Sequence, residues 1–317
     1  MIEETLPRVS VVVISYNGAD VIRECLSSVL ASDYPNLEVV LVNNGSTDDL
    51  PQIAKREYPE VRLIELYPNR GYAGGMNEGL KVARGEILIP LNDDTEITPN
   101  LITEMVRPFL HLKNVGIVGC KILYPDRKTI QHAGGIILPS GHTRHIGYLE
   151  EDQGQYEELR EVDYVTGCAI AIPRKIFEQL GLYDDRYYPT YFEEVEYAVR
   201  VRKAGYKVIY APKAVLYHKE SKTEIKYSPQ FLYRYSKSRL RFILKNFELR
   251  QIPAALFYEL QWFAKIDWKE YFIPLTKAYF STLLRLPVIL YDRYYRFLPL
   301  APLEDRDHTE SNRPHPQ

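Results

Sequence analysis

The 317-residue sequence has few cysteines and no excess of charge of either sign. Its three cysteines, Cys25, Cys120 and Cys168, lie far apart and match neither a zinc-binding nor a redox spacing. Each one lies in an apolar stretch, so we expect small core residues in a reducing compartment. Lysine and arginine total 40 against 42 aspartates and glutamates, which argues against a nucleic-acid binder that relies on bulk positive charge.

The sequence also lacks long uncharged apolar runs and the common nucleotide-binding loops. No such run is long enough to cross a bilayer, and Glu3 and Glu4 stand where a secretion signal would carry basic residues. We therefore expect a cytoplasmic protein. No Walker loop, Gly-x-Ser-x-Gly or Gly-x-Gly-x-x-Gly motif occurs, so we expect no nicotinamide cofactor.

What the sequence does contain is an alternation of apolar strands and helical segments. Buried strands are expected at residues 9–15, 37–42, 61–66, 86–91 and 115–123. This alternation predicts an α/β fold, in which helices flank a mostly parallel sheet. From about residue 120 the regular alternation of strands and helices ends. Residues 132–151 are typical of an antiparallel hairpin or a flexible flap.

Four of the expected strands end in small polar or acidic residues. These endings are Ser15 to Gly18, Asn43 to Asp48, Asn69 to Gly71, and Asn92 to Glu96. One such ending is explained by a turn, but four at one edge of a parallel sheet indicate a polar cleft. The fourth ending presents oxygen ligands suited to Mg²⁺ or Mn²⁺ beside a diphosphate, although a helix-capping loop before residue 98 explains it as well.

A second acidic cluster, Glu193, Glu194 and Glu196, lies in the first turn of a helix expected at residues 192–204. The helix dipole favours acids there, which is the structural explanation. The functional explanation is a carboxylate presented as a general base, with its pKa raised by neighbouring carboxylates. Three acids within four residues exceed what capping needs, and only Arg200 stands at helical spacing to offset Glu196.

Together these stretches resemble glycosyltransferase family 2, which has the GT-A fold, and are most similar to its bacterial rhamnosyltransferase-like branch. The resemblance covers about residues 8–222. It is carried by VSVVVISYNG, EVVLVNNGSTDD, NRGYAGGMNEGL, GEILIPLNDDTEI, residues 165–212 and VLYHKES. It implies inverting transfer of a sugar, with rhamnose as the first guess, from a TDP- or UDP-linked donor. The implied acceptor is a hydroxyl of a glycan or a lipid-linked molecule in cell-surface polysaccharide synthesis.

The resemblance also implies roles for individual residues. Asp94 and His218 would hold Mn²⁺ or Mg²⁺, Glu194 would act as the base, and Glu193 would support it or contact the acceptor. The implied nucleotide-sugar-binding residues are Ser15, Tyr16, Asn17, Asn43, Asn44, Ser46, Asn69, Gly71, Asn77, Asp93 and Gly167. Asparagine at positions 43 and 92, and glutamate at position 194, stand where the family usually or often has aspartate.

We expect a GT-A catalytic domain at residues 1–222, with a nucleotide-binding half at about 8–120 and an acceptor half at about 121–222. Residues 223–303 are expected to form a helical extension rich in aromatic and basic residues, and residues 304–317 a disordered tail. Three interpretations of the extension stay open: a cap on the catalytic domain, a segment on the inner membrane face, and an oligomer contact.

Two other functions are compatible with a polar cleft in an α/β fold. A nucleotidyltransferase would use a similar cleft and metal, but its glycine-, arginine- and lysine-rich phosphate loop is absent near the first strand. A non-catalytic carbohydrate-binding or scaffold protein needs neither acidic cluster, and the acids retained at both sites argue against it. The sequence indicates neither the sugar, the acceptor nor the oligomeric state.

Overall fold

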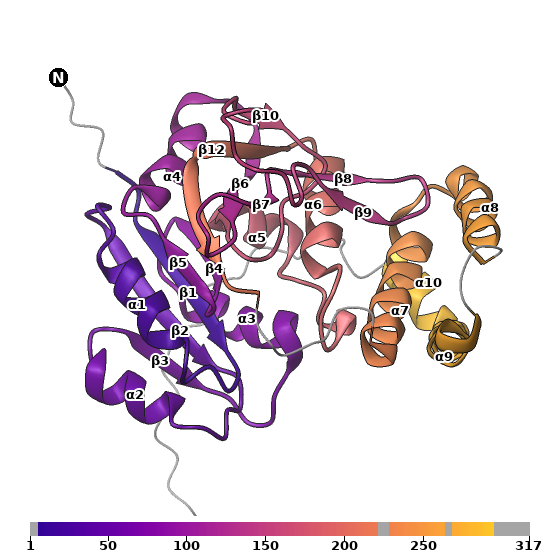
Figure 1. Cartoon of the computed structure of the whole chain (residues 1–317), viewed down its shortest axis with the longest axis horizontal. Helices are drawn as coiled ribbons and strands as arrows, with labels where there is room; N and C mark the ends of the chain where they lie inside the picture. The colour runs from indigo at the N-terminus through magenta and orange to yellow at the C-terminus, as the bar shows by residue number, and fades with distance from the viewer. Residues whose placement is uncertain (1–5, 221–227, 264–267, 295–317) are drawn as a thin grey trace, which may run out of the picture.

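The computed structural model describes residues 6–220, 228–263 and 268–294 (Figure 1). A large α/β unit carries the sheet, and four helices, α7 to α10, form a layer at one side of it (Figure 1). The predicted tail at 304–317 lies outside the described residues.

The main sheet has ten strands, eight of them in the order β10-β12-β6-β11-β4-β1-β2-β3. Strands β1 (Val9–Ser15), β2 (Leu37–Asn43), β3 (Arg62–Glu65) and β4 (Ile87–Asn92) run parallel to their neighbours in this group. The predicted mostly parallel sheet is therefore confirmed, and the four polar strand ends meet at one edge.

Alternate residues of β1 face two separate hydrophobic layers, because successive side chains of a strand point to opposite faces. Val11 and Val13 pack with helices α1 (Ile22–Leu30), α2 (Leu50–Glu57) and α4 (Leu101–His111). Val12 and Ile14 pack with α3 (Gly71–Val82), α5 (Arg174–Leu180) and α6 (Glu193–Lys203). Burial on both faces explains why the strand is mostly apolar.

The second half of the sheet is mixed rather than parallel. Strand β11 (Ile170–Pro173) is inserted antiparallel between β4 and β6 (Val115–Leu123). The long strand β12 (Lys207–His218) runs parallel to β6, and its last residues pair antiparallel with β5 (Thr95–Ile97). The insertion of β11 carries residues 167–169 to the polar edge, and the β12–β5 pairing carries the end of β12 there.

The short strands complete the region between β6 and α5. Strand β7 (Ile130–His132) pairs with β6, and β10 (Arg160–Glu161) pairs with β12. Strands β8 (Gly135–Ile137) and β9 (Thr143–His145) form a separate antiparallel hairpin, as the sequence predicts for residues 132–151. A one-turn 3-10 helix, η1 (Asp185–Tyr187), lies between α5 and α6.

The C-terminal layer consists of α7 (Pro229–Asn246), η2 (Leu249–Gln251), α8 (Ile252–Phe263), α9 (Trp268–Leu284) and α10 (Leu286–Tyr294). Helix α7 begins where the Ser228 hydroxyl accepts a hydrogen bond from the Phe231 N–H. It inserts Phe242 and Ile243 into the same core cluster as α3, α5 and α6. Among the described residues, no single helix is long and apolar enough to span a membrane. The helical segments 271–284 and 286–294, which are bent by 59° relative to each other, are long and apolar enough only when taken together.

Candidate active site

The ends of β1, β2 and β4 lie side by side at the polar edge. Ser15 is paired in register with Asn43, and Ile14 with Asn92. The Ser15 hydroxyl donates a hydrogen bond to the Asp93 carboxylate, which follows β4. Burial raises the pKa of Asp93 to about 7, although the Ser15 hydrogen bond opposes the shift. Two residues of the predicted donor pocket are therefore in direct contact.

The loops after β1 and β2 are held together by side-chain caps on backbone N–H groups. The Asn17 N–H donates to the Ser46 hydroxyl (2.9 Å), and the Thr47 N–H donates to the Asn17 amide oxygen (2.8 Å). The Ser46 N–H donates to the Asn43 amide oxygen (2.9 Å). Tyr16 is 44% exposed, so its ring is accessible beside these loops. The structure thus brings together all the residues predicted for the base and ribose pocket at the first two strand ends.

The loop before α3 is fixed by two asparagine side chains. The Asn44 amide donates to the Gly71 carbonyl (3.0 Å), and the Asn69 amide oxygen accepts from the Gly71 N–H (2.8 Å). Gly71 has φ +71°, and a Cβ on it would lie 2.8 Å from the Pro189 carbonyl oxygen. Only glycine therefore allows this close approach of α3 to the loop that precedes α6.

Asn77 lies farther along α3 and is buried. Its amide oxygen accepts from the Tyr183 N–H (3.1 Å), and its amide group donates to the Tyr183 carbonyl (2.9 Å). Both ends of the side chain are thus occupied by backbone groups, which ties α3 to the segment before η1. A direct contact between Asn77 and a donor stays a prediction.

Asp94 and His218 meet at the end of the β12–β5 ladder. The His218 Nε2 lies 3.1 Å from the Asp94 Oδ1, and its Nδ1 lies 2.6 Å from the Gln131 amide oxygen. If Nδ1 carries the proton and donates it to Gln131, the Nε2 lone pair faces the Asp94 carboxylate. That arrangement of one imidazole nitrogen and one carboxylate fits a divalent cation.

The remaining ligands of such a cation would come from the substrate. Within residues 6–220, 228–263 and 268–294, no group of three or more His, Cys, Asp or Glu side chains is arranged to hold a metal ion. Asp94 and His218 would then share the cation with a diphosphate, the ligand that the resemblance implies. The sequence predicted this pair but not Gln131, because nothing in its local pattern links residue 131 to residue 218.

The paired glutamates begin α6 after an unusual stretch of backbone. Tyr191 and Phe192 have φ of +82° and +73°, values that bulky residues rarely adopt and that indicate local strain. Glu193 is buried, with its Oε1 3.3 Å from the Thr190 hydroxyl. Its Oε2 has no hydrogen-bond partner among the described residues. Glu194 is partly exposed.

Burial raises the pKa values of both carboxyl groups above the value of an ordinary glutamate. Burial and then the neighbouring Glu194 raise the pKa of Glu193 well above its usual value. Burial raises the pKa of Glu194 to about 7, while hydrogen bonds from backbone N–H groups oppose the shift. The raised pKa favours the protonated form of Glu193, and a pKa of about 7 lets Glu194 exchange a proton near neutral pH, which is the behaviour required of a general base.

The segment Gly167-Cys168 lies between the two acidic clusters. The Asn92 N–H donates to the Cys168 carbonyl (3.0 Å), and the Tyr72 hydroxyl donates to the Gly167 carbonyl (2.7 Å). A Cβ on Gly167 would lie 3.7 Å from the Glu194 Cβ. The strand end that bears Asp94 and the helix start that bears Glu194 therefore flank one short backbone segment.

Helix α7 contributes contacts to the site that the sequence did not indicate. The Lys237 ammonium donates to the Tyr188 carbonyl (2.8 Å), and the Ser238 hydroxyl donates to the Thr190 carbonyl (3.3 Å). Both contacts hold the loop that leads into the paired glutamates. The domain boundary at residue 222 stays a prediction, but the loop before α6 depends on residues beyond it.

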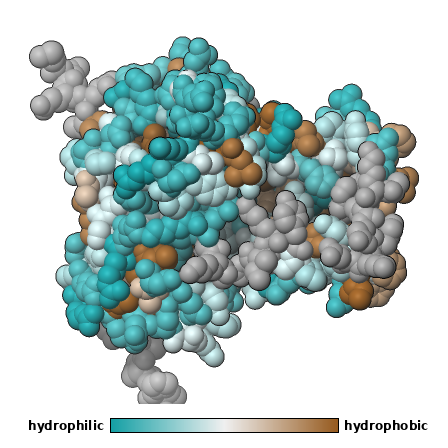
Figure 2. Space-filling view, viewed as in Figure 1, coloured by the Kyte–Doolittle hydropathy of each residue, from teal (hydrophilic) through white to brown (hydrophobic). Residues whose placement is uncertain are grey.

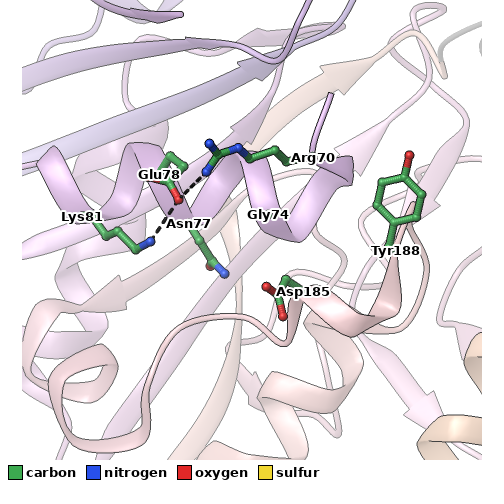
Figure 3. A pocket seen from close by; sticks show the side chains of 7 residues that line it. All are labelled: Arg70, Gly74, Asn77, Glu78, Lys81, Asp185 and Tyr188. Carbon is green, nitrogen blue, oxygen red and sulfur yellow. Dashed lines mark hydrogen bonds and ion pairs between the residues drawn. The ribbon is translucent and has the colours of Figure 1, made fainter. Parts of the chain in front are cut away.

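A separate polar pocket of about 330 Å³ lies along another face of α3 (Figure 3). Its wall includes Asn77, Asp185 and Tyr188. Glu78, also in the wall, is engaged by Arg70 (3.1 Å) and Lys81 (3.0 Å), as the dashed lines of Figure 3 show. This pocket contains neither acidic cluster, so we place the candidate active site at the strand ends instead.

Sequence comparisons match the chain to a known family. Residues 10–181 match the family model of Glycosyl transferase family 2. The chain is 30% identical over 238 residues to the N-acetylglucosaminyl-diphospho-decaprenol L-rhamnosyltransferase of Mycobacterium tuberculosis, over 67% of this chain and 76% of that protein. It is 32% identical over 225 residues to the O-antigen biosynthesis protein RfbC of Myxococcus xanthus, over 68% of this chain but 17% of that protein's length.

Solved structures share the fold at lower sequence identity. GalNAc-T7 with UDP, GalNAc and Mn²⁺ aligns with a TM-score of 0.61 and 20% identity, over 77% of this chain and 48% of that one. The mannosyltransferase PcManGT of Pyrobaculum calidifontis with GDP-Man and Mn²⁺ aligns with a TM-score of 0.55 and 21% identity, over 90% and 74% of the two chains. These similarities confirm the predicted GT-A fold.

Proposed function

The chain belongs to glycosyl transferase family 2, and from that membership we propose that it is an inverting enzyme. It moves a sugar from a nucleotide-diphosphate donor to a hydroxyl group of an acceptor. The observation that supports the proposal is that Gly167-Cys168 contacts both the strand end that leads to Asp94 and the start of the helix that bears Glu194. One acid can serve the diphosphate while the other serves the attacking hydroxyl.

Glu194 is the proposed general base. With a pKa of about 7 it is partly ionised at neutral pH, so it can accept the proton of the acceptor hydroxyl as that oxygen attacks the anomeric carbon. The raised pKa of Glu193 favours a neutral carboxyl group beside it, which lessens the repulsion that Glu194 meets when it ionises. Attack on the face opposite the leaving diphosphate inverts the anomeric centre.

Asp94 and His218 are the proposed ligands of Mn²⁺ or Mg²⁺, and a nitrogen ligand favours Mn²⁺ over Mg²⁺. Such a cation supplies positive charge that stabilises the diphosphate as it leaves. Gln131 would keep the His218 ring in the orientation that directs Nε2 toward the cation. The Mn²⁺ named with GalNAc-T7 and with PcManGT supports a divalent cation in this fold.

The proposed donor pocket lies at the first two strand ends. The caps between Asn17, Asn43 and Ser46 shape its loops, and Tyr16 offers an exposed ring against which a base can stack. Rhamnose linked to TDP is our first choice of donor, because the Mycobacterium relative is named as an L-rhamnosyltransferase. The same name supports a lipid-linked diphosphate glycan as the acceptor, and both relatives support a role in cell-surface polysaccharide synthesis.

A donor panel tests the proposal. The full chain is incubated with Mn²⁺ and with TDP-rhamnose, UDP-GlcNAc, UDP-galactose or GDP-mannose, and the release of nucleoside diphosphate is measured. We expect one nucleotide sugar to be turned over, and a Glu194→Gln variant to turn it over far more slowly. Turnover of no donor, or equal turnover by the variant, would contradict the proposal. Omission of Mn²⁺ from the same assay tests the cation.

A further inference from the structure

The outer surface of α8, α9 and α10 exposes large apolar side chains to an unusual degree. Several of them are each more than half exposed, including Phe257, Leu260, Ile273, Phe280, Leu283 and Leu284. Hydrophobic residues also appear in brown at the outer edge of this layer in Figure 2. Large apolar side chains exposed in this number on neighbouring helices favour an interaction site over ordinary protein surface. We call this surface of α8 to α10 the docking face.

Among the charged side chains of α8 to α10 that the structure describes, the exposed ones are cationic. The acids of these helices whose side chains the structure describes, Glu259 and Asp292, are buried and paired with Arg239 and Arg241 of α7. Lys277 and Arg285, by contrast, are exposed. The docking face therefore presents apolar groups together with cations, and its described acids are turned inward.

We propose that the docking face binds the surface of a bilayer that contains anionic phospholipids. Apolar side chains would enter the boundary between headgroups and acyl chains, while Lys277 and Arg285 would contact the anionic headgroups. A partner protein surface would not specifically require this combination, whereas an anionic bilayer complements both parts of it.

The helices lie on the bilayer rather than cross it. One side of α9 and α10 packs inward through Leu275, Ala278 and Ile289, which are almost fully buried, and the other side forms the docking face. Glu259 of α8 and Asp292 of α10 hold these helices to α7 through ion pairs inside the protein. Crossing the bilayer would place these buried ion pairs in hydrocarbon or break them.

The same helix joins the docking face to the candidate active site. Arg239 of α7 binds Glu259 (2.6 Å), and Lys237 and Ser238 hold the loop that leads to the paired glutamates. A protein bound through the docking face would therefore hold its cleft at a constant orientation to the bilayer. This orientation suits the lipid-linked acceptor proposed above, but the docking itself does not depend on that proposal.

Liposome flotation of the full chain tests the inference. Vesicles of phosphatidylcholine with 30% phosphatidylglycerol are compared with vesicles of phosphatidylcholine alone, at low and high salt. We expect the wild type to float with the anionic vesicles at low salt and much less with the neutral ones. Equal flotation with both kinds of vesicle, or no flotation with either, would overturn the proposal.

Two double variants separate the apolar from the ionic contribution. Leu260→Glu/Leu284→Glu places charge on the docking face, and we expect at least a tenfold loss of binding to anionic vesicles. Lys277→Glu/Arg285→Glu leaves the apolar residues in place, and we expect it to remove the preference for anionic over neutral vesicles. The matched controls, Leu110→Glu on α4 and Lys113→Glu, lie outside the docking face and are expected to float like the wild type.

Two further measurements make the outcomes unambiguous. Circular dichroism of each variant establishes that it is folded, and hydrolysis of a water-soluble donor reports on the active site without a membrane. If the wild type does not hydrolyse the donor, this result counts against the proposed function but does not affect the conclusion on membrane docking. If the wild type is a dimer that does not float, and Leu260→Glu/Leu284→Glu is a monomer, the docking face is a surface for self-association and the proposal is wrong.

Discussion

The Lys245 ammonium of α7 lies 2.9 Å from the Glu196 carboxylate of α6 and 2.8 Å from the Asp184 carboxylate. Arg241 of the same helix also binds Asp184, at 2.7 Å. All four side chains are buried. Buried charges are tolerated when each is paired, so separating α7 from α6 would break several ion pairs at once. The C-terminal helices are thus fixed to the helix that carries the paired glutamates.

We therefore expect Lys245→Met to lower the free energy of unfolding by about 3 kcal/mol or more, because it leaves two buried carboxylates without this partner. Urea denaturation followed by circular dichroism measures the change. Lys55→Met is the matched control, since Lys55 forms an exposed pair with Glu65 and should cost less than about 1 kcal/mol. Equal costs for the two substitutions would show that the network contributes no more than a surface pair.

The second prediction distinguishes the roles of the two glutamates by replacing each of them with glutamine. Glu194→Gln removes the proposed base and should lower kcat by about 100-fold or more, with binding of the donor nucleotide unchanged. Glu193→Gln should retain most of the activity, because an amide resembles the protonated carboxyl group that burial favours at this position. Steady-state kinetics and nucleotide calorimetry on both variants check this. Equal loss in both variants would mean that the pair acts as a unit.

The pH dependence of the rate follows from the pKa of Glu194. The base must be ionised, so kcat/KM should rise with pH through about 7 and fall about tenfold per unit well below it. Asp93 has a similar pKa and must be distinguished from it. Ser15→Ala removes the hydrogen bond that lowers the pKa of Asp93. If the rise of kcat/KM with pH reports on Asp93, this variant should shift that rise to higher pH. If Ser15→Ala leaves the rise of kcat/KM at the same pH, the rise reports on Glu194.

The same raised pKa has a consequence for stability. A carboxyl group whose pKa is higher in the folded than in the unfolded protein favours folding when protonated, and this contribution is lost as pH rises from about 4.5 to about 7. Glu194→Gln cannot ionise, so it should be more stable than the wild type at pH 8 and nearly equal to it at pH 4. Thermal unfolding of both proteins at the two pH values measures the difference. A difference that does not change with pH would contradict the raised pKa.

The parts of the fold that the sequence predicted are those with local signals. The strand β1 is a mostly apolar stretch of seven residues, and the polar residues that follow it mark the sheet edge. Because parallel strands point their carboxyl ends the same way, the ends of β1 to β4 could be placed together before any contact was known. The paired acids at positions 193 and 194 could be assigned roles only through resemblance to a family.

The parts that the sequence did not predict depend on contacts between distant segments. The short strand β11 reads as one more apolar stretch, and only packing against β4 and β6 determines its antiparallel position. Gln131 approaches His218 from 87 residues away. Lys245 lies in the extension that the sequence predicts to be helical and rich in basic residues, and no local pattern indicates that its ammonium is buried against Glu196. Neither periodicity nor composition encodes such pairings.

The last prediction concerns the cation, and it is tested by measuring nucleotide binding rather than activity. Calorimetry of UDP or TDP with the full chain, with and without Mn²⁺, measures how far the cation strengthens nucleotide binding. Asp94→Asn should abolish this strengthening, because it removes the only carboxylate that the structure brings to His218 Nε2 among the described residues. Nucleotide binding in the absence of Mn²⁺ should change little.

Gln131→Leu tests the second half of the same geometry. The substitution removes the acceptor of the His218 Nδ1 proton, so the ring loses the contact that directs Nε2 toward Asp94. Partners of this kind typically contribute about 10- to 100-fold to metal affinity, and we expect a loss of that size in the Mn²⁺ affinity. Gln179→Leu, at a site that contacts Tyr206 instead, is the control. If Gln131→Leu binds Mn²⁺ as tightly as the control, His218 is not oriented through residue 131, and its role as a ligand loses its structural support.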